Sequence, residues 1–365
     1  MTTSKQQISD NNNTNESNSR VRHLGHFGQT IIYLGKLFRM FVFQNDWKVL
    51  PMAALIAGLV SFVVGKNIFV TMEGTLMGSF AVSCICIWNG FFNSIQVVCR
   101  ERSIIKREHR AGLHISSYIL AHMIYQAVLC ILQSIITIAV CHAFEMNFPK
   151  VSYITGIAIL DVGICLFLIT YCADMMALMI SSIVRTTTTA MTVMPFLLIF
   201  QLVFSGGIFQ LEGGASALTN LTIAKWGLTS LCSQGNYNDL PMVSVWNSML
   251  KMKNVKMKDI PIENIDLSGL IDESDETSVL LPDNLTLKDL PINENYRPIN
   301  EAFKAMEKNG QRENFLLTCG SYNQNENFVS TSDNILHCWR MLIFYIILFA
   351  ACATISLEFV DRDKR

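Results

Sequence analysis

The chain has 365 residues, of which 51% are hydrophobic and only 16% are charged, and its mean hydropathy is +0.34. Average soluble domains carry about 25% charged residues, so this composition excludes an ordinary water-soluble enzyme. The chain is nevertheless too polar to lie in a membrane throughout, and we expect membrane spans joined to one polar segment. The net charge of −1 says little, because the position of each charge matters more in a membrane protein than the sum.

The chain opens with two segments of different character. Residues 1–24 have no apolar run of the about 7–15 residues that a signal peptide requires, and we expect a disordered cytoplasmic tail. Residues 25–46 place apolar side chains mostly on one side of a helix, with Lys36 and Arg39 away from the centre of that side. This pattern is typical of an amphipathic helix that lies in the membrane interface, and the two charges argue against a further span.

Six stretches reach the roughly 20 mostly apolar residues that a transmembrane helix needs. The sequence therefore predicts an all-α membrane protein with six transmembrane helices, the first five within residues 47–209 and the sixth within 335–357. The apolar stretches run from Trp47 to Gly65, from Gly74 to Val98, from Ser117 to Ala143, from Val151 to Val184, from Ala190 to Phe209 and from Arg340 to Leu357.

Lys and Arg are distributed unevenly between these spans. With the N-terminus inside, the inner segments hold most of them, including five between Arg100 and Arg110. The short outer segments hold only Lys66, Lys150 and Arg340. Because positive residues collect on the cytoplasmic side, we expect a multi-pass protein of the plasma membrane with both termini cytoplasmic, including the tail at 358–365.

A polar segment separates the fifth and sixth spans. Residues 210–334 hold seventeen acidic and ten basic side chains, and we expect an extracytoplasmic loop or insert there. Cys232 and Cys319 are its two cysteines. On an oxidising face they can form one disulfide, although a single pair of cysteines does not demand it.

Neither a nucleotide site nor a metal site is indicated. The chain has no G-x-x-x-x-G-K-[ST] loop, so we expect no ATP hydrolysis by this chain alone. Cys84 and Cys86 lack the second pair that a tetrahedral zinc site needs. We therefore expect no catalytic residue, no metal and no cofactor in this chain, and no nucleic-acid partner.

Ionisable side chains inside membrane spans are costly and are functional candidates by default. Asp161 lies well inside the expected fourth span, and His122 and His142 lie near opposite ends of the third. Asp161 is either a hydrogen-bonded aspartate between helices or a group that takes part in substrate or proton transfer.

Amide side chains form two further sets of candidates. Asn89 and Asn93 are four residues apart in the second span, on one helical face, and Phe92 stands in the neighbouring apolar stripe. In the fifth span Gln201 accompanies the aromatic residues Phe196 and Phe200. Buried amides in a membrane need partners, so each set either joins two helices or borders a water-filled cavity.

The inner loop between the second and third spans is the most informative segment. It runs from Cys99 to Gly112 and carries charges of both signs on a predicted short helix. A plain cytoplasmic anchor accounts for the arginines but requires neither Glu101 nor Glu108. The adjacent apolar residues Ile104 and Ile105 indicate a docking face on this helix.

This loop resembles the coupling helix of G-subfamily-like ABC exporter permeases, whose pattern is E-R-x-x-F-x-R-E-x-x-x-G followed by a tyrosine. The matching residues are Glu101, Arg102, Ile105, Arg107, Glu108, Gly112 and Tyr118, with Ile105 in place of the usual aromatic residue. The stretches from Ser181 to Gly214 and from Leu221 to Leu231 resemble the fifth span and the following outer helix of such permeases. The insert from about Val243 to Asp333 is not covered by the resemblance.

The resemblance implies a permease that exports an amphipathic or lipid-like substrate. Residues 25–46 become the connecting helix, and two six-span units pair. The ATPase that binds ATP and Mg is then a separate subunit, which docks on Arg100, Glu101, Arg102, Ile105, Arg107, Glu108 and Gly112. Substrate-cavity candidates are Asn89, Phe92, Asn93, Phe196, Phe200 and Gln201. The outer valve comprises Val203, Phe204, Ser205 and Gly206.

Three other readings of the sequence stay open. A proton-coupled secondary transporter or channel would use Asp161 and the histidines. A membrane-embedded enzyme would need His122, His142 and Asp161 to converge at one depth. A non-transporting sensor subunit would bind a ligand through its acidic outer insert.

Overall fold

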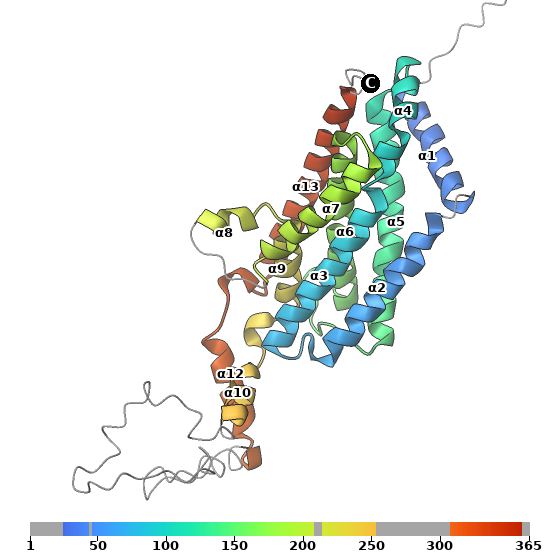
Figure 1. Ribbon diagram of the computed structural model, residues 1–365. Helices are drawn as coiled ribbons and strands as arrows, with labels where there is room; N and C mark the ends of the chain where they lie inside the picture. Colours follow the sequence, from blue (N-terminus) through green and yellow to red (C-terminus); the bar gives the residue numbers. More distant parts are fainter. Residues whose placement is uncertain (1–24, 44–45, 208–213, 253–306, 360–365) are drawn as a thin grey trace, which may run out of the picture.

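A computed structural model describes residues 25–43, 46–207, 214–252 and 307–359 (Figure 1). Helices dominate these residues, and no strand occurs in the described ranges. The expected all-α class is therefore confirmed for this part of the chain. The expected tail at 1–24, residues 360–365 of the expected tail at 358–365, and the middle of the insert, 253–306, lie outside it.

Five segments within the described ranges are long and apolar enough to cross a membrane. Four of their helices are α2 (Val49–Val64), α5 (Ile115–Ala143), α6 (Ala158–Ile183) and α13 (Ser332–Glu358). The remaining segment combines α3 (Met72–Ser94) with α4 (Val97–Arg110), which follows it after a break at Ile95 and Gln96. The expected fifth span corresponds to α7 (Thr187–Val203), which has only 17 residues, so the count of six spans is not confirmed.

Four of the helices begin at a threonine with an extended backbone. Thr71, Thr186, Thr222 and Thr331 each accept a hydrogen bond through the side chain from the backbone N–H three residues later. This is the N-cap arrangement, which satisfies one of the free N–H groups of the first turn. It explains why α13 begins at Ser332, eight residues before the expected start at Arg340, and why α7 begins before Ala190.

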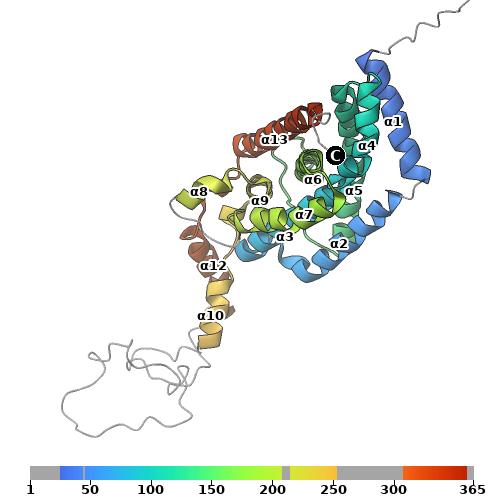
Figure 2. The same cartoon turned by 45° about the horizontal axis from the view of Figure 1, so that its top comes forward.

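Helix α6 lies in the middle of the bundle (Figure 2), packed mainly against α3 and α13. The approach of α3 is close because of Gly90: a Cβ atom there would lie 2.3 Å from the carbonyl oxygen of Thr170. A glycine at such a crossing lets two helix backbones touch, as is common between membrane helices.

The expected fourth span corresponds to α6 and begins at Ala158, because residues 151–157 form a loop.

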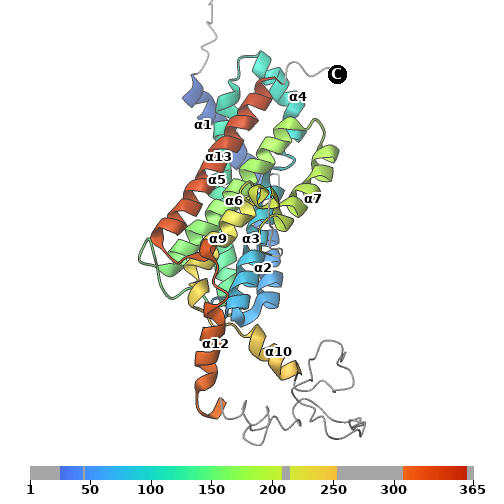
Figure 3. The same cartoon turned by 90° about the vertical axis from the view of Figure 1, so that its left-hand side faces the viewer.

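Part of the expected outer insert belongs to the core of the bundle. After α8 (Gly214–Thr219), helix α9 (Ile223–Gln234) packs against α3, α6 and α13, and every residue of it except Lys225 is buried. Helices α10 (Ser244–Met252) and α12 (Gln311–Ser321) extend from the end of the bundle (Figure 3). Net acidity therefore did not distinguish the buried helix from the polar part of the same segment.

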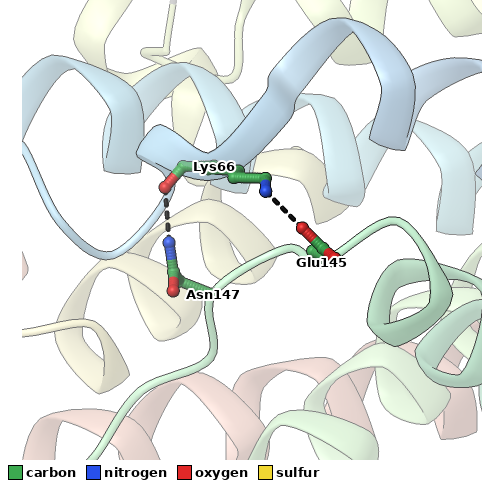
Figure 4. A network of polar contacts seen from close by, with 3 residues as sticks. All are labelled: Lys66, Glu145 and Asn147. Carbon is green, nitrogen blue, oxygen red and sulfur yellow. Dashed lines mark hydrogen bonds and ion pairs between the residues drawn. The ribbon is translucent and has the colours of Figure 1, made fainter.

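The two ends of the bundle differ. At one end lie α4, the start of α1 (His26–Phe43) and the end of α13 (Figure 1). At the other end Lys66, after α2, pairs with Glu145, after α5, and its carbonyl accepts a hydrogen bond from Asn147 (Figure 4). This network joins two loops that are far apart in the sequence.

Candidate functional site

The helix α4, expected as the coupling helix, has two distinct faces. Val98, Glu101 and Ile105 are buried against the bundle, whereas Arg100, Ile104 and Arg107 are exposed. The two sets alternate with the three- and four-residue spacing of an α-helix. The adjacent isoleucines are therefore divided, with Ile105 as an inner anchor at 1% exposure and Ile104 as an outer apolar contact at 36%.

Hydrogen bonds attach the buried face of α4 to the end of α6. The hydroxyl of Ser181 accepts from the backbone N–H groups of Val98 and Cys99, at 3.1 and 3.2 Å. Arg102 donates through Nη1 to the carbonyl oxygens of Ser182 and Val184, at 2.8 and 3.1 Å. Because α6 occupies the middle of the bundle, these bonds connect α4 directly to its central helix.

The two glutamates of the α4 motif point into the protein. Glu101 is buried and accepts a hydrogen bond from the hydroxyl of Tyr118, at 3.5 Å. Glu108 is half-buried, and one of its carboxylate oxygens has no hydrogen-bond partner among the described residues. A role for Glu101 in direct contact with a partner does not fit this burial, whereas a role in positioning α4 against α5 does.

Helix α1, expected as the connecting helix, is hydrogen-bonded to the segment that follows α4. The side chain of Gln29 donates to the carbonyl oxygen of Gly112, at 3.1 Å, and accepts from the backbone N–H of His114, at 2.9 Å. The rings of His26 and His114 stack with centroids 3.8 Å apart. Gly112 has φ of 102°, a backbone conformation that favours glycine, which explains why this position of the motif carries one.

The cavity candidates of α3 divide between a surface groove and a helix contact. Asn89 and Phe92 border a groove of about 200 Å³ beside the start of α2. Asn93 exchanges two hydrogen bonds with Gln133 of α5, each 2.9 Å long. Asn93 therefore follows the alternative in which an amide joins two helices, whereas Asn89 borders the groove.

The candidates of α7 are also divided. Phe196 is 69% exposed, and the ring of Phe200 lies 4.9 Å from that of Phe204. Gln201 is buried, and its side-chain oxygen accepts from the N–H groups of Ile223 and Ala224, at 2.8 and 3.2 Å. Its amide thus completes the first turn of α9 and is not presented to a cavity.

The expected outer valve forms the end of α7 and the turn that follows. Val203 is the last residue of α7, and Phe204 follows it as the C-cap. Ser205 is buried and donates to the carbonyl oxygen of Leu202 at 2.7 Å, and Gly206 has φ of 76°. The carbonyl of Phe204 accepts from Thr222 at 3.2 Å, so the turn is attached to the start of α9.

Asp161 occupies the first turn of α6, and not a position well inside the span. One carboxylate oxygen accepts from the hydroxyl of Ser152 at 2.6 Å and from the N–H groups of Tyr153 and Ile154. The other accepts from the N–H of Thr155 at 3.1 Å. The carboxylate therefore organises the loop before α6. Of the two alternatives for Asp161, this is the hydrogen-bonded aspartate, although it binds a loop and does not lie between two helices.

The two cysteines of the outer insert are both free thiols in the structure. Cys232 is fully buried in α9, packed in a cluster with Met72, Leu228 and Tyr237, whereas Cys319 is half-buried in α12. The disulfide considered from the sequence is therefore not formed, because one thiol is enclosed in the bundle.

The structure contains a further cavity, which two of the cavity candidates from the sequence, Phe92 and Asn93, border together with residues that the sequence did not assign to a cavity. It has a volume of about 310 Å³ and lies between α1, the start of α2, α3, α4, α5 and α7. His122 and Gln126 of α5 border it, together with Phe92, Asn93 and Arg100. The available signal was the pair of polar residues four positions apart in an apolar helix, because this spacing aligns them on one face.

The comparisons with known proteins agree with this architecture. No curated protein matches the chain. The family described as ABC-2 type transporter matches residues 34–222, more than half of the chain. The match includes α4, the groove beside α2, the cavity of about 310 Å³ and the central helix α6. The chain therefore belongs to the ABC-2 type transporter family and is the membrane permease component of an ABC transporter.

Proposed function

We propose that this permease exports an amphipathic or lipid-like substrate and is driven by a separate ATPase subunit that docks on α4. The two-faced character of α4 is the observation that supports the proposal. Its inner face is hydrogen-bonded to α6, and Gly112, just after α4, is hydrogen-bonded to α1, while the outer face of α4 presents Arg100, Ile104 and Arg107. Exposed cations around an apolar side chain suit an acidic groove on a partner protein.

ATP and Mg²⁺ bind on the partner in this proposal, and this chain contributes motion. Closure of the ATPase around nucleotide pushes α4, and the bonds from Arg102 and to Ser181 carry the displacement to α6. The permease then exchanges an inward-facing arrangement for an outward-facing one, a two-state switch that nucleotide binding biases.

A second permease copy would cover the apolar face formed by α3 and α7. The large apolar side chains exposed there are Trp88, Phe92, Met191, Phe196 and Ile199. Pairing through this face would place Asn89, Phe92 and Phe196 along a path between the two copies, with the turn from Val203 to Gly206 at its outer end. In this arrangement both termini and α4 face the cytoplasm of a cell whose plasma membrane holds the transporter.

The test uses the full-length tagged chain purified from membranes together with its ATPase, with vanadate-sensitive ATP hydrolysis as the readout. We expect Ile104→Asp and Arg107→Glu to lower the co-purified activity about tenfold, since exposed contacts at the centre of an interface carry most of its binding energy. Arg340→Glu is the matched control, because Arg340 is an exposed arginine of α13, away from α4.

Each variant must also remain folded, which its size-exclusion profile reports. Unchanged ATPase activity in both α4 variants would count against docking on this face. Loss of activity in Arg340→Glu would show instead that any charge reversal disturbs the complex.

A further inference from the structure

Helix α1 lies along the outside of the bundle (Figure 2), and its outward side carries a groove. The opposite side packs against α5, with Thr30 and Leu37 buried. The groove has a volume of about 600 Å³ and is lined by Ile31, Ile32, Gly35, Lys36, Arg39, Met40 and Phe43. Most of these residues are exposed. Apolar side chains therefore stand at both ends of the groove, and two cations and a glycine lie in its middle.

The glycine in the groove is not required by any described neighbour. Glycine in the middle of a helix is less favourable than alanine. A Cβ atom at Gly35 would meet no described atom within 4 Å, whereas one at Gly90 would meet the backbone of α6. Gly35 therefore does not serve the packing of these helices. A group from outside the chain that approaches the α1 backbone accounts for its lack of a side chain.

The two cations of the groove lie on one face of the helix, three positions apart. Neither Lys36 nor Arg39 pairs with a carboxylate among the described residues. The sequence of α1 itself contains no Asp or Glu. The Nζ atom of Lys36 lies 5.0 Å from the centroid of the Tyr33 ring, a contact that does not neutralise its charge. The groove thus offers two positive charges to an anion.

Ring contacts with α5 set the depth of the groove. His26, at the start of α1, stacks on His114, just before α5, and Phe38 lies against Tyr125 with ring centroids 5.6 Å apart. The interval from His114 to Tyr125 corresponds to about 16 Å of helix. Because α5 is long enough to cross the bilayer, α1 descends from the surface into the region where headgroups meet acyl chains. Long Lys and Arg side chains at that level reach lipid phosphates.

Charge and apolar surface together indicate the occupant. A free phosphate ion would satisfy the cations but would leave the exposed side chains of Ile31, Ile32 and Phe43 uncovered. A second copy of α1 would cover them but would set like charges against each other, because this helix carries no carboxylate. A phospholipid of net negative charge supplies a phosphate for the cations and an acyl chain for the apolar surface.

We propose that the α1 groove binds an anionic phospholipid of the leaflet on the α4 side. The phosphate lies over Gly35, between Lys36 and Arg39, and one acyl chain follows Met40 and Phe43 toward the bilayer centre. In the orientation proposed above, this leaflet is the inner one. The site involves neither the ATPase nor the transported substrate, so its test is independent of theirs.

The experiment uses the full-length chain in phosphatidylcholine nanodiscs that contain a trace of a photoreactive lipid. The two probes are a phosphatidylglycerol and a phosphatidylcholine that carry the same diazirine at the headgroup end of one chain. Labelled peptides are mapped by mass spectrometry. Peptides of α1 should be labelled about tenfold more by the phosphatidylglycerol, because two basic residues attract a lipid of net negative charge. Peptides of α2, whose exposed side chains are apolar, should be labelled equally by both probes.

Variants separate a built site from a general response to charge. Lys36→Gln combined with Arg39→Gln should abolish the preference for phosphatidylglycerol in α1. Arg340→Gln is the matched control, because it removes an exposed arginine from α13, and it should leave the preference unchanged. Gly35→Leu keeps both charges but fills the groove, and it should lower the preference. Its Cβ meets no described atom, so the variant should keep the size-exclusion profile of wild type.

Four results would overturn the proposal. Equal labelling of α1 by the two probes in wild type would mean that lipid charge is not recognised. An unchanged preference in Gly35→Leu would mean diffuse attraction without a site. Competition by soluble glycerol phosphate would assign the groove to a free ion, and a disulfide-linked dimer of Gly35→Cys would assign it to a second copy.

Discussion

Arg102 of α4 donates a hydrogen bond to the carbonyl oxygen of Ser182, at 2.8 Å, and another to that of Val184, at 3.1 Å. These carbonyls lie at the end of α6, where a helix leaves its last carbonyl groups unpaired and carries partial negative charge. The guanidinium therefore completes the end of the central helix. A motif residue that resembled a partner contact from the sequence is an internal connection.

Arg102→Met should separate this connection from docking. Loss of two charge-assisted hydrogen bonds from a partly exposed arginine should destabilise the protein by about 1–3 kcal/mol, and transport per ATP hydrolysed should fall. Thermal unfolding followed by tryptophan fluorescence measures the loss of stability, and transport assays in proteoliposomes measure the transport per ATP hydrolysed. Arg100→Met, at an exposed position of the same helix, should leave the unfolding temperature unchanged. An unaltered unfolding temperature in Arg102→Met would mean that the bonds contribute nothing.

Gly90→Ala should disrupt the contact of α3 with α6. The added Cβ would lie 2.3 Å from the Thr170 carbonyl oxygen and 2.7 Å from the Asp174 nitrogen, both backbone atoms that cannot rotate away. Overpacking of this kind costs about 1–3 kcal/mol or more, so the unfolding temperature should fall. Gly58→Ala is the control, because its Cβ would meet Phe144 at 3.6 Å, an ordinary contact. If both variants unfold alike, the helices do not cross as closely as the structure shows.

Asp161→Asn should loosen the loop before α6. An amide has only one accepting oxygen, so its NH₂ group would face the backbone donors that the carboxylate now satisfies. We expect a loss of about 1–3 kcal/mol in stability and faster hydrogen exchange at residues 152–155. Asp333→Asn, in the first turn of α13 but exposed, should have little effect. A proton-coupled mechanism through Asp161 predicts the opposite, with intact stability and lost transport.

The Lys66–Glu145 pair should make a small, pH-dependent contribution. The hydrogen bond from Lys66 and its positive charge lower the pKa of the Glu145 carboxyl from its ordinary value of 4.5. A lowered pKa in the folded state stabilises the protein above the ordinary value, and this contribution is lost as the pH falls through the lowered pKa. Glu145→Gln should therefore unfold at a slightly lower temperature than wild type at about pH 7, and the two should converge in acid, once the pH has fallen below the lowered pKa.

The pair is fully exposed, so the difference at neutral pH is expected to be small and sensitive to salt. Glu313→Gln, at an exposed position of α12, is the matched control and should follow wild type at both pH values. A difference that persists at low pH would show that Glu145 acts through its backbone turn, where φ is 56°, and not through its charge.

The membrane helices and the α4 motif could be predicted from the sequence because both depend on local composition and spacing. A run of apolar residues is enough to indicate a span, and charges spaced three and four residues apart are enough to indicate a short helix outside the apolar runs. The predicted boundaries differed from the observed ones where a loop or a threonine N-cap sets the start of the helix, as at Ala158 and Ser332.

The roles of single polar residues could not be predicted in the same way. Gln201 looked like a cavity residue but caps α9, twenty-two positions further along the chain. Asp161 looked like an intramembrane acid but binds a loop. In both cases most of the partners are backbone N–H groups, which carry no signal in the sequence of side chains.

The low content of charge and the long apolar runs determined by themselves that much of the chain lies in a membrane, and the order of residues placed five basic side chains on one short helix. Only the tertiary structure decided that Ile105 faces inward and Ile104 outward, that α9 is buried, and that α5 lines a cavity with two polar side chains. The reason is physical: composition and spacing set which segments leave water, whereas the rotation of each helix is set by packing against neighbours distant in sequence.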